Sequence, residues 1–467
     1  MKNVTYEELL ERKKHHFKSH GFSVDDSDLN KNLFDFQKSV VKWALRKGKA
    51  ALFEGTGLGK TIQELSWAEQ VHRITNKPVL IIAPLAVVPQ TVSEANKFGI
   101  SAKQVFENDQ VFNGINVTNY ERVEKFDAST FIGVVLDESS ILKSFISRTS
   151  QMMIETFKDT PYKLCATATP SPNDYTELGT TSEFLGVMRK DEMLSMYFIN
   201  DIQGKNKPGQ PKGGIGWRLK GHSEKEFYKW IATWGMFINH PRDLGFEDKG
   251  YDLPGLEITP IVLKSQADIG SLFPERAETL TERREARKLS LDDRAQKTME
   301  LIEASPDDQW LIWVNYNDEG EKLRKMIPNS SEVSGSDKPE DKVERFINFS
   351  NGNLPILITK PKIAGFGMNW QRCNKMIFMG ISDSFEQFYQ AVRRCYRFGQ
   401  EKEVKVYIVL SEKEMNVLEN IQLKQYKHEH MVENMRETMK DFLIEELNGH
   451  EYKNTEYKPQ VDMLLPF

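Results

Sequence analysis

The sequence predicts an α/β protein with two domains, each built around a parallel β-sheet that is flanked by helices. Short runs rich in Val, Ile and Leu alternate with helical patterns over most of the 467 residues. Such runs are typical of parallel strands that are buried on both faces. They fall into two sets, separated by a long segment of different composition. We therefore expect two α/β domains rather than one large sheet.

The predicted strands define the two domains and the segments around them. The first set comprises residues 49–53, 79–83, 131–136 and 162–166, and the second comprises 310–314, 355–359, 375–379 and 404–410. From these sets we predict six units: an N-terminal helical extension (1–30), a first lobe (31–185), a helical and aromatic insertion with a basic loop (186–256), a linker or brace (257–294), a second lobe (295–412), and C-terminal helices with a tail (413–467).

A glycine-rich turn lies between the first predicted strand and the helix after it. Its residues are Gly55, Thr56, Gly57, Leu58, Gly59, Lys60 and Thr61. Backbone N–H groups of such a turn and the helix N-terminus surround a phosphate. Lys60 would reach the β- and γ-phosphates of a nucleotide, and the Thr61 hydroxyl would bind Mg²⁺. Glu54 stands where the strict motif has glycine, and the glycines at 55 and 57 supply the flexibility instead.

Two acidic residues, Asp137 and Glu138, directly follow the predicted strand at 131–136. Ligands of a doubly wound sheet bind at the carboxyl ends of its strands. We expect Asp137 to hold Mg²⁺ through water, and Glu138 to orient and activate an attacking water.

Three arginines within five residues, Arg393, Arg394 and Arg397, lie in the second predicted lobe. Arginines on a second lobe can complete a phosphate site only when the lobes close, which couples nucleotide state to motion. The alternative is a surface helix with solvated arginines.

These motifs together resemble the superfamily 2 helicase-like ATPases, and within them the Swi/Snf-type translocases. The matching segments follow the family's order: residues 33–37 with Trp43, 54–63, 83–85, 117–121, 136–144, 166–173, 359–370 and 390–400. The resemblance implies two RecA-like lobes that bind ATP and Mg²⁺ between them. The segment 227–256 looks most like phage or prophage DEAD/DEAH-box-like members.

The resemblance also implies roles for individual residues. Gln37 would read the adenine, Gly365 and Gly367 would belong to the nucleotide site, and Gln390 would contact the nucleotide network. Arg394 and Arg397 would be arginine fingers, and Thr167 and Thr169 would couple hydrolysis to lobe movement. Contacts to DNA would come from Pro84, Asn119, Lys143, Thr359 and Lys360. Ser140 and Tyr396 depart from the family, which often has histidine at both positions.

Composition excludes several other classes of protein. No apolar run approaches 18 residues and the N-terminus has no apolar core, so we expect neither a membrane span nor a signal peptide. The three cysteines, Cys165, Cys373 and Cys395, are too scattered for a zinc site or a disulfide framework. We therefore expect a protein of the reducing cytoplasm, which is the bacterial host cytoplasm if the protein is phage-encoded. The net charge of −5 leaves room for a local basic groove. His15, His16 and His20 fit a solvated helix face better than a metal site.

Two features of the insertion have open interpretations. The loop 203–216, with Lys205, Lys207 and Lys212, is either a basic flap over a nucleic acid or a solvated segment. The tryptophans Trp217, Trp230 and Trp234 either form a small core, as the i, i+4 spacing of the last two favours, or stack bases.

The function expected from these observations is an ATP-dependent DNA translocase or helicase. The favoured DNA is duplex rather than single-stranded, and we expect a monomer. The resemblance to phage members also suggests a role among phage replication or recombination proteins. Two alternatives stay open: an ATP-switched nucleic-acid clamp that does little mechanical work, and a motor that remodels bound protein without separating strands.

Overall fold

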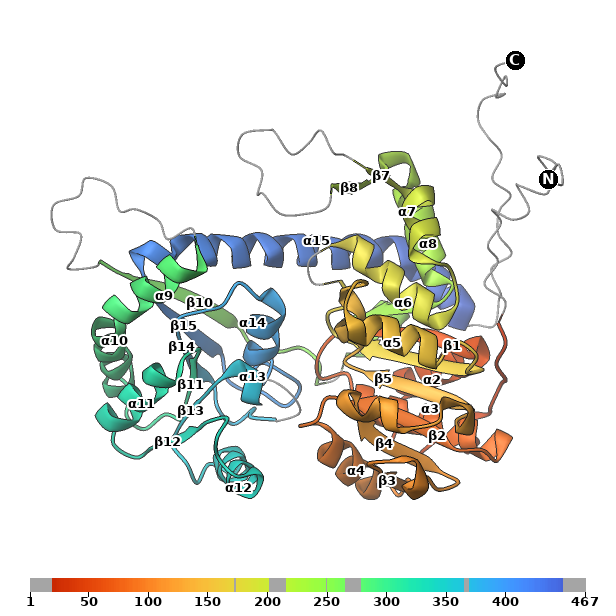
Figure 1. Cartoon of the computed structure of the whole chain (residues 1–467), viewed down its shortest axis with the longest axis horizontal. Helices are drawn as coiled ribbons and strands as arrows, with labels where there is room; N and C mark the ends of the chain where they lie inside the picture. Colours follow the sequence, from red (N-terminus) through yellow and green to blue (C-terminus); the bar gives the residue numbers. More distant parts are fainter. Residues whose placement is uncertain are drawn as a thin grey trace, which may run out of the picture.

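The computed structural model describes residues 19–171, 174–200, 216–248, 250–264, 279–364 and 369–447. It contains two α/β lobes that lie side by side, with one long helix running across both (Figure 1). Each lobe has a sheet in which every strand is parallel to its neighbours. The two predicted parallel-sheet domains are therefore confirmed.

The sheet of the first lobe has seven strands in the order β3-β4-β2-β5-β6-β1-β9. The strands are β1 (Lys49–Glu54), β2 (Val79–Ala83), β3 (Ala102–Gln104), β4 (Ile115–Asn119), β5 (Gly133–Asp137), β6 (Tyr162–Thr167) and β9 (Gly235–Ile238). The strand β9 comes from the predicted insertion and pairs with β1 from Ala51 to Glu54. The sheet therefore continues beyond residue 185 of the chain.

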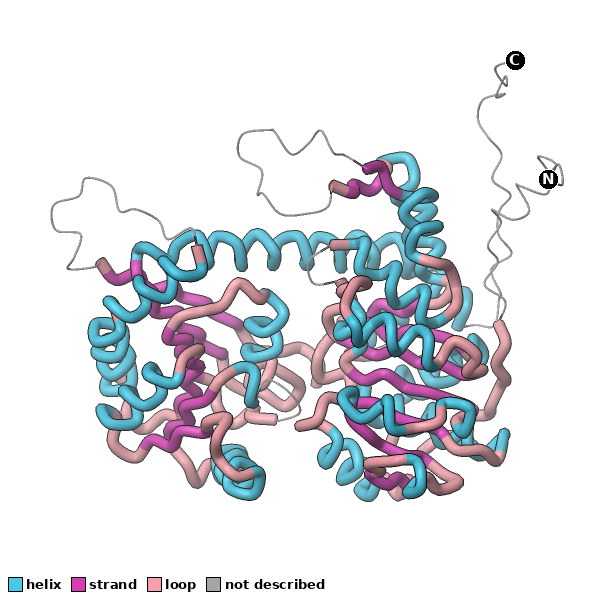
Figure 2. Tube along the Cα trace, viewed as in Figure 1, coloured by secondary structure: helices cyan, strands magenta, loops and turns pink. Residues whose placement is uncertain are grey.

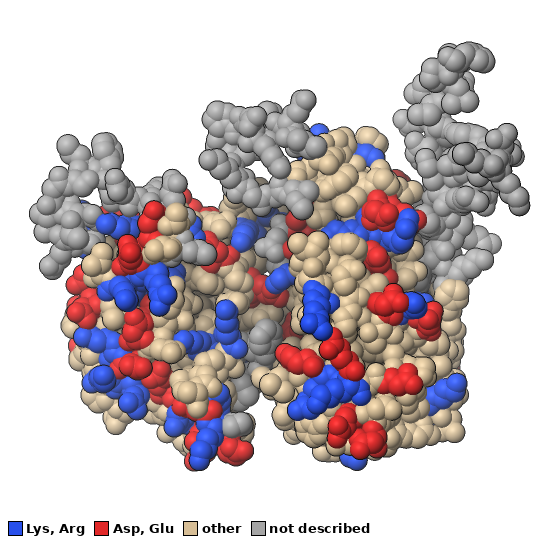
Figure 3. Space-filling model, in the orientation of Figure 1, with Lys and Arg blue, Asp and Glu red and all other residues tan. Residues whose placement is uncertain are grey.

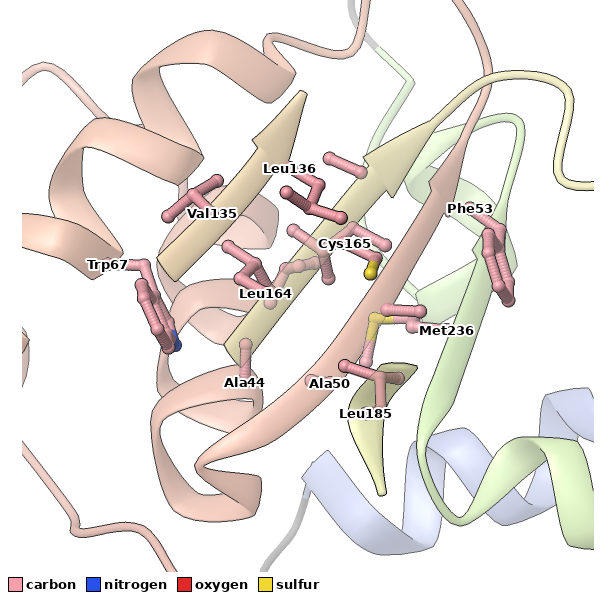
Figure 4. Close-up of a cluster of buried hydrophobic side chains, with 14 of the residues drawn as sticks. Ala44, Ala50, Phe53, Trp67, Val135, Leu136, Leu164, Cys165, Leu185 and Met236 are labelled. Carbon is pink, nitrogen blue, oxygen red and sulfur yellow. The ribbon is translucent and has the colours of Figure 1, made fainter. Parts of the chain in front are cut away.

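Helices cover both faces of this sheet (Figure 2). They are α2 (Asp35–Lys47), α3 (Lys60–Thr75), α4 (Val88–Lys97), α5 (Arg148–Thr156) and α6 (Leu178–Leu185). The core between them is apolar, and Figure 4 shows Val135 of β5, Leu164 and Cys165 of β6, and Met236 of β9 within it. This packing keeps the carboxyl ends of the strands at fixed positions.

A small subdomain follows the first six strands of this lobe. It consists of α7 (Lys190–Tyr197), an antiparallel hairpin of β7 (Phe198–Asn200) and β8 (Trp217–Leu219), and α8 (Glu224–Ala232). Trp230 and Trp234 are buried, with ring centroids 5.3 Å apart. Their burial in this aromatic cluster supports the core interpretation over base stacking, whereas the lysines of the loop 203–216 lie outside the described residues.

The sheet of the second lobe has six strands in the order β10-β15-β14-β11-β13-β12. They are β10 (Leu256–Leu263), β11 (Trp310–Val314), β12 (Ser330–Val333), β13 (Ile356–Thr359), β14 (Lys375–Met379) and β15 (Val404–Ser411). The helices are α9 (Leu280–Leu289), α10 (Leu291–Glu303), α11 (Asn317–Met326), α12 (Pro339–Ser350), α13 (Pro361–Ala364) and α14 (Phe385–Val392). Most of β10 lies in the segment expected to be a linker, and it forms an edge of the sheet instead.

The C-terminal segment forms one continuous helix, α15 (Met415–Leu447), where the sequence suggested several. At 1.5 Å per residue its 33 residues span about 50 Å. Its first turns bury Val417, Leu418 and Ile421 in the core of the second lobe. Its later turns bury Met431, Met435, Met439 and Leu443 in the core of the first lobe. The helix therefore ties the two lobes together.

Short 3-10 helices complete the described chain: η1 (Asp26–Asp28), η2 (Asn108–Gln110), η3 (Tyr120–Lys125), η4 (Ala128–Thr130), η5 (Ser139–Lys143), η6 (Tyr175–Glu177), η8 (Gly221–Ser223), η9 (Pro241–Leu244) and η11 (Glu412–Glu414). Of the expected N-terminal helical extension, residues 1–18 lie outside the described part, and residues 19–30 contain only η1. Within the described ranges, no helix combines the length and apolarity needed to cross a membrane.

Candidate active site

The chemically important residues of the first lobe gather at one edge of its sheet. Strands β5, β6 and β1 are neighbours, and the carboxyl ends of all three lie at the same edge. Asp137 ends β5, Thr167 ends β6, and the glycine-rich loop follows β1. The topology thus brings together groups that lie far apart in the sequence.

The glycine-rich loop depends on two positions whose backbone conformation only glycine adopts without strain. Gly57 and Gly59 have φ angles of 94° and 83°, in the left-handed region. A Cβ atom on Gly59 would lie 2.3 Å from Nε2 of Gln37, and one on Gly57 would lie 3.1 Å from the backbone nitrogen of Phe398. The loop is therefore packed between α2 of its own lobe and the end of the arginine motif of the second lobe.

The side chain of Lys60 folds back over this loop. Its Nζ donates hydrogen bonds to the carbonyl oxygens of Glu54, at 3.0 Å, and Gly55, at 3.3 Å. Beneath it, Gln63 Nε2 donates to Glu54 Oε2 at 2.8 Å. The position of Lys60 at the first turn of α3 suits a cation that meets the phosphates held by the loop.

Four carboxylates surround Lys60: Glu54, Glu64, Asp137 and Glu138. Burial raises the pKa of Glu54 to about 7, and burial together with the charge of Glu138 raises the pKa of Asp137 to about 7. Burial also raises the pKa values of Glu64 and Glu138, while the charge of Lys60 lowers both. A cation bound among these four carboxyl groups would lower their pKa values and favour their charged forms.

A buried cluster of carboxyl groups of this kind fits a divalent metal ion. Both carboxylate oxygens of Glu64 are buried and have no hydrogen-bond partner among the residues that the structure describes. Asp137 is 7% exposed, and Thr61 is half-buried in the first turn of α3. A hydroxyl and carboxylate oxygens are the hard ligands that Mg²⁺ prefers. The residues present are therefore suited to Mg²⁺, with Thr61 and Asp137 as the groups that would hold it.

Glu138 has a backbone conformation that is unusual for its type. Its φ of 53° lies in the left-handed region, where a non-glycine residue is strained. Thr167 Oγ1 lies 3.4 Å from Glu138 Oε2 and accepts a hydrogen bond from the backbone nitrogen of Thr169 at 3.1 Å. The Tyr120 hydroxyl donates to the carbonyl oxygen of Asp137 at 2.7 Å. These contacts hold the acidic pair against the end of β6.

The second lobe contributes arginines to the same region. Arg394 and Gln390 are buried, at 9% and 4% exposure. Burial and the neighbouring Arg397 lower the pKa of Arg394 to about 10, whereas the charges of Glu138 and Asp137 raise it. Arg397 donates a hydrogen bond to Asn369 Oδ1. Arg394 is therefore electrostatically coupled to the acidic pair of the first lobe and is not a solvated surface arginine.

The two lobes are also joined directly by Glu386 on α14. Ser140 Oγ donates to Glu386 Oε1 at 2.7 Å, and Lys143 forms an ion pair with Glu386 Oε2. Sequence reasoning missed both Glu386 and Glu64. Glu386 lies four residues before Gln390 on one helix, so the i, i+4 rule would have put it on the same face. Glu64 similarly lies one turn after Lys60.

The residues expected to contact DNA have mixed surroundings. Pro84 is half-buried next to Leu85, which is 61% exposed. Asn119 is 5% exposed and donates to Glu121. Lys143 faces Glu386, as described above.

In the second lobe, Thr359 is fully buried and donates to the carbonyl oxygen of Val333 at 3.0 Å, so its side chain offers no surface contact. Lys360 is half-buried and donates to Asn317. On the face in Figure 3, Lys and Arg are interspersed with Asp and Glu over both lobes. Gly365 and Gly367 lie outside the described residues.

Comparison with known proteins assigns a domain to each lobe. Residues 36–194 match the SNF2-related domain, and residues 293–399 match the helicase conserved C-terminal domain. The first match contains Lys60 and the Asp137–Glu138 pair, and the second contains Arg394 and Arg397. The chain therefore carries an SNF2-related domain in its first lobe and a helicase C-terminal domain in its second.

Individual relatives are distant. The SWI/SNF chromatin-remodeling complex subunit snf22 of Schizosaccharomyces pombe is 22% identical over 84% of this chain, which spans 27% of the length of that protein. A SWI/SNF-related subfamily A-like protein 1 of Xenopus tropicalis is 27% identical over 33% of this chain, which spans 17% of its length. The uncharacterized ATP-dependent helicase YqhH of Bacillus subtilis is 23% identical over 92% of this chain and 85% of its own.

The chain also matches a solved structure of the SWI2/SNF2 ATPase core of Sulfolobus solfataricus in complex with dsDNA. This match covers 91% of this chain and 98% of the chain of that structure, at 19% identity and a TM-score of 0.41.

Proposed function

We propose that the chain is an ATP-dependent motor that hydrolyses ATP between its two lobes and thereby moves along DNA. One observation carries the proposal: Glu138 of the first lobe and Arg394 of the second are close enough for their charges to alter each other's pKa. When groups from two bodies meet at one phosphate, the state of that phosphate controls how the bodies move.

The roles of the residues follow from their surroundings. Lys60 meets the β- and γ-phosphates, and Glu138, whose pKa burial raises, takes a proton from the attacking water. Thr61 and Asp137 hold Mg²⁺, which neutralises phosphate charge when bound. Arg394 and Arg397 stabilise the charge that develops on the transferred group, and Gln390 supports this network from α14.

The substrate track is the second part of the proposal. Two Bacillus subtilis relatives are named as an ATP-dependent helicase and a putative helicase/translocase. We assign duplex DNA as the favoured track, with contacts from the Pro84–Leu85 backbone, Asn119 and Lys360. A role in phage DNA replication or recombination in the cytoplasm of a host rests on the likeness of the segment 227–256 to phage members of the superfamily.

The first experiment measures ATP turnover alone and with single-stranded DNA, duplex DNA and RNA. The expected result is stimulation by DNA, strongest with duplex, and loss of turnover in Lys60→Ala. Lys42→Ala is a matched control, because Lys42 pairs with the exposed Asp26 on the surface of the first lobe. Turnover that no nucleic acid raises would contradict a DNA motor.

The second experiment separates the candidate activities. Displacement of a third strand from a DNA triplex, without unwinding of the underlying duplex, would identify a translocase. Unwinding would identify a helicase. ATP-dependent DNA binding without either activity would favour the clamp, and release of a protein block without triplex displacement would favour the remodelling motor.

A further inference from the structure

We propose that a cavity on the second lobe, bordered by Arg284 and Lys288 of α9, binds phosphates of the DNA backbone. This inference rests on the proposed function, in which each lobe holds the DNA in turn, and it names the residues by which the second lobe does so. The family resemblance assigned Thr359 and Lys360 to this task. The Thr359 hydroxyl is buried and donates to Val333, so of these two residues only Lys360 can offer its side chain to DNA.

The cavity that contains Lys360 has a volume of about 430 Å³, which is within the range of ligand sites. Its lining comes from α9, the start of α10, the first turns of α11 and the ends of two strands. Tyr316 follows β11, and Lys360 directly follows β13, which pairs with β11 in the sheet. All of these elements belong to the second lobe, so the cavity is separate from the glycine-rich loop of the first.

Three basic residues lie on the face of α9 that borders the cavity. Arg284, Arg287 and Lys288 are spaced i, i+3 and i+4, which puts them on one side of the helix. Arg287 is buried, forms an ion pair with Glu414 and donates to the carbonyl oxygen of Ile381, so it anchors α9 to the lobe. Arg284 and Lys288 are exposed, and within the described ranges neither forms an ion pair. These two cations are therefore available to a ligand.

The ring of Tyr316 orients both arginines of α9. The guanidinium carbon lies 6.0 Å from the ring centroid for Arg284 and 5.5 Å for Arg287, within the range of cation–π contacts. The backbone nitrogen of Tyr316 donates to Glu319 Oε2 at 3.0 Å, and the other oxygen of Glu319 pairs with the buried Arg294 at 2.8 Å. The wall of the cavity is therefore positioned by buried ion pairs before any ligand binds.

The charge of the cavity suits a phosphodiester. Arg287 and Glu319 also line it, but each is neutralised by its buried partner. The exposed or half-buried charged residues of the lining are the cations Arg284, Lys288 and Lys360 and the carboxylates Asp318 and Glu321. Three cations against two carboxylates leave one positive charge, which matches the single negative charge of a backbone phosphate.

The donors of these cations are the kind that hold a phosphate without reading a base. Lys360 Nζ donates one hydrogen bond to Asn317, and an ammonium group has two further donors. The guanidinium of Arg284 adds a planar fork of donors that matches phosphate oxygens. Contacts of this kind position a protein on DNA and carry no sequence information. The cavity should therefore bind duplexes of any sequence and should lose affinity as salt is added.

The test is the salt dependence of DNA binding, measured by fluorescence anisotropy with the full chain and a labelled duplex of mixed sequence. The logarithm of the binding constant falls with the logarithm of the salt concentration by about 0.9 for each phosphate contact. The double variant Arg284→Ala/Lys288→Ala should reduce the magnitude of this slope by about 1 to 2 and weaken binding at low salt. A second duplex of unrelated sequence should show the same reduction, because phosphate contacts do not depend on the bases.

Two further double variants serve as controls. Arg284→Lys/Lys288→Arg keeps both charges and should keep the slope of the wild type. Arg324→Ala/Lys325→Ala removes the same two residue types from exposed positions in the last turn of α11, at the other end of that helix from the cavity, and should also leave the slope unchanged. An unchanged slope in Arg284→Ala/Lys288→Ala, an equal fall in Arg324→Ala/Lys325→Ala, or a fall with only one of the two duplexes would overturn the inference.

ATP turnover is measured separately with the same proteins, so the two proposals can fail independently. If DNA raises turnover but the slope does not depend on Arg284 and Lys288, the proposed motor stands and this site is rejected. If the slope falls as expected but no DNA raises turnover, the site stands and the motor is contradicted.

Discussion

Ser140 of the first lobe donates a 2.7 Å hydrogen bond to Glu386 of the second, 246 residues away in the chain. Lys143 forms an ion pair with the other oxygen of the same carboxylate. Both residues lie in η5, immediately after the acidic pair, while Glu386 shares α14 with Gln390. Glu386 thus connects the segment after β5 of one lobe to the helix that precedes the arginines of the other.

Breaking this connection should reduce the communication between the lobes. We expect Glu386→Gln to lower DNA-stimulated ATP turnover by about 2- to 30-fold, the range of coupling changes of about 0.5–2 kcal/mol. Glu300→Gln is the control, because Glu300 pairs with Lys297 on the surface of the second lobe. Equal turnover in the two variants would show that the contact does not contribute to the cycle.

The stabilisation of the fold by Mg²⁺ and ATP should depend on Asp137. Mg²⁺ with ATP should raise the melting temperature of the wild type, because a ligand that binds only the folded state stabilises it. In Asp137→Asn this increase should be largely lost, as it should be for the wild type in EDTA. Asp109→Asn, a change of an exposed aspartate, should keep the full increase. An undiminished increase in Asp137→Asn would remove Asp137 from the metal site.

The buried Glu54 should make stability depend on pH. Burial raises its pKa from the ordinary 4.5 to about 7, so the folded chain retains a proton that the unfolded chain has released. Its contribution is complete below pH 4.5 and is lost as the pH rises through 7.

We therefore expect the free energy of unfolding of the wild type to fall, relative to Glu54→Gln, between pH 5 and 7.5. The difference should be a few kcal/mol at most, because one pKa unit corresponds to about 1.4 kcal/mol. Denaturant titrations at several pH values measure it. Glu107→Gln, at an exposed position, should show the same pH dependence of the free energy of unfolding as the wild type. If Glu54 were charged throughout this pH range, Glu54→Gln would also show the pH dependence of the wild type.

The docking of α15 on the first lobe should stabilise that lobe. Met435 is fully buried in the core of the first lobe although it comes after the whole second lobe in sequence. Met435→Ala should cost about 2–5 kcal/mol of unfolding free energy. Leu423→Ala, on the same helix and 39% exposed, is the control. Amide exchange in α8 and β9, on which this part of α15 packs, should increase only in Met435→Ala.

Sequence patterns predicted the interior strands best. The expected ranges 79–83, 310–314 and 375–379 coincide with β2, β11 and β14, because a strand buried on both faces needs a continuous apolar run. The edge strands were not predicted: β9 has only four residues, and β10 is partly exposed along its whole length. Among site residues, Thr359 had been expected at a DNA surface, yet it is fully buried and its hydroxyl donates to Val333 of the neighbouring β12.

The sequence by itself determined the glycine-rich loop. Gly57, Gly59, Lys60 and Thr61 act through local backbone geometry, which depends on neighbouring residues and the turn from β1 into α3. Only the tertiary structure decided which distant groups meet that loop. Glu386 beside Ser140, Asn239 beside Gly55 and Met435 in the first core are set by strand order and packing, and such contacts leave no periodic signal along the chain.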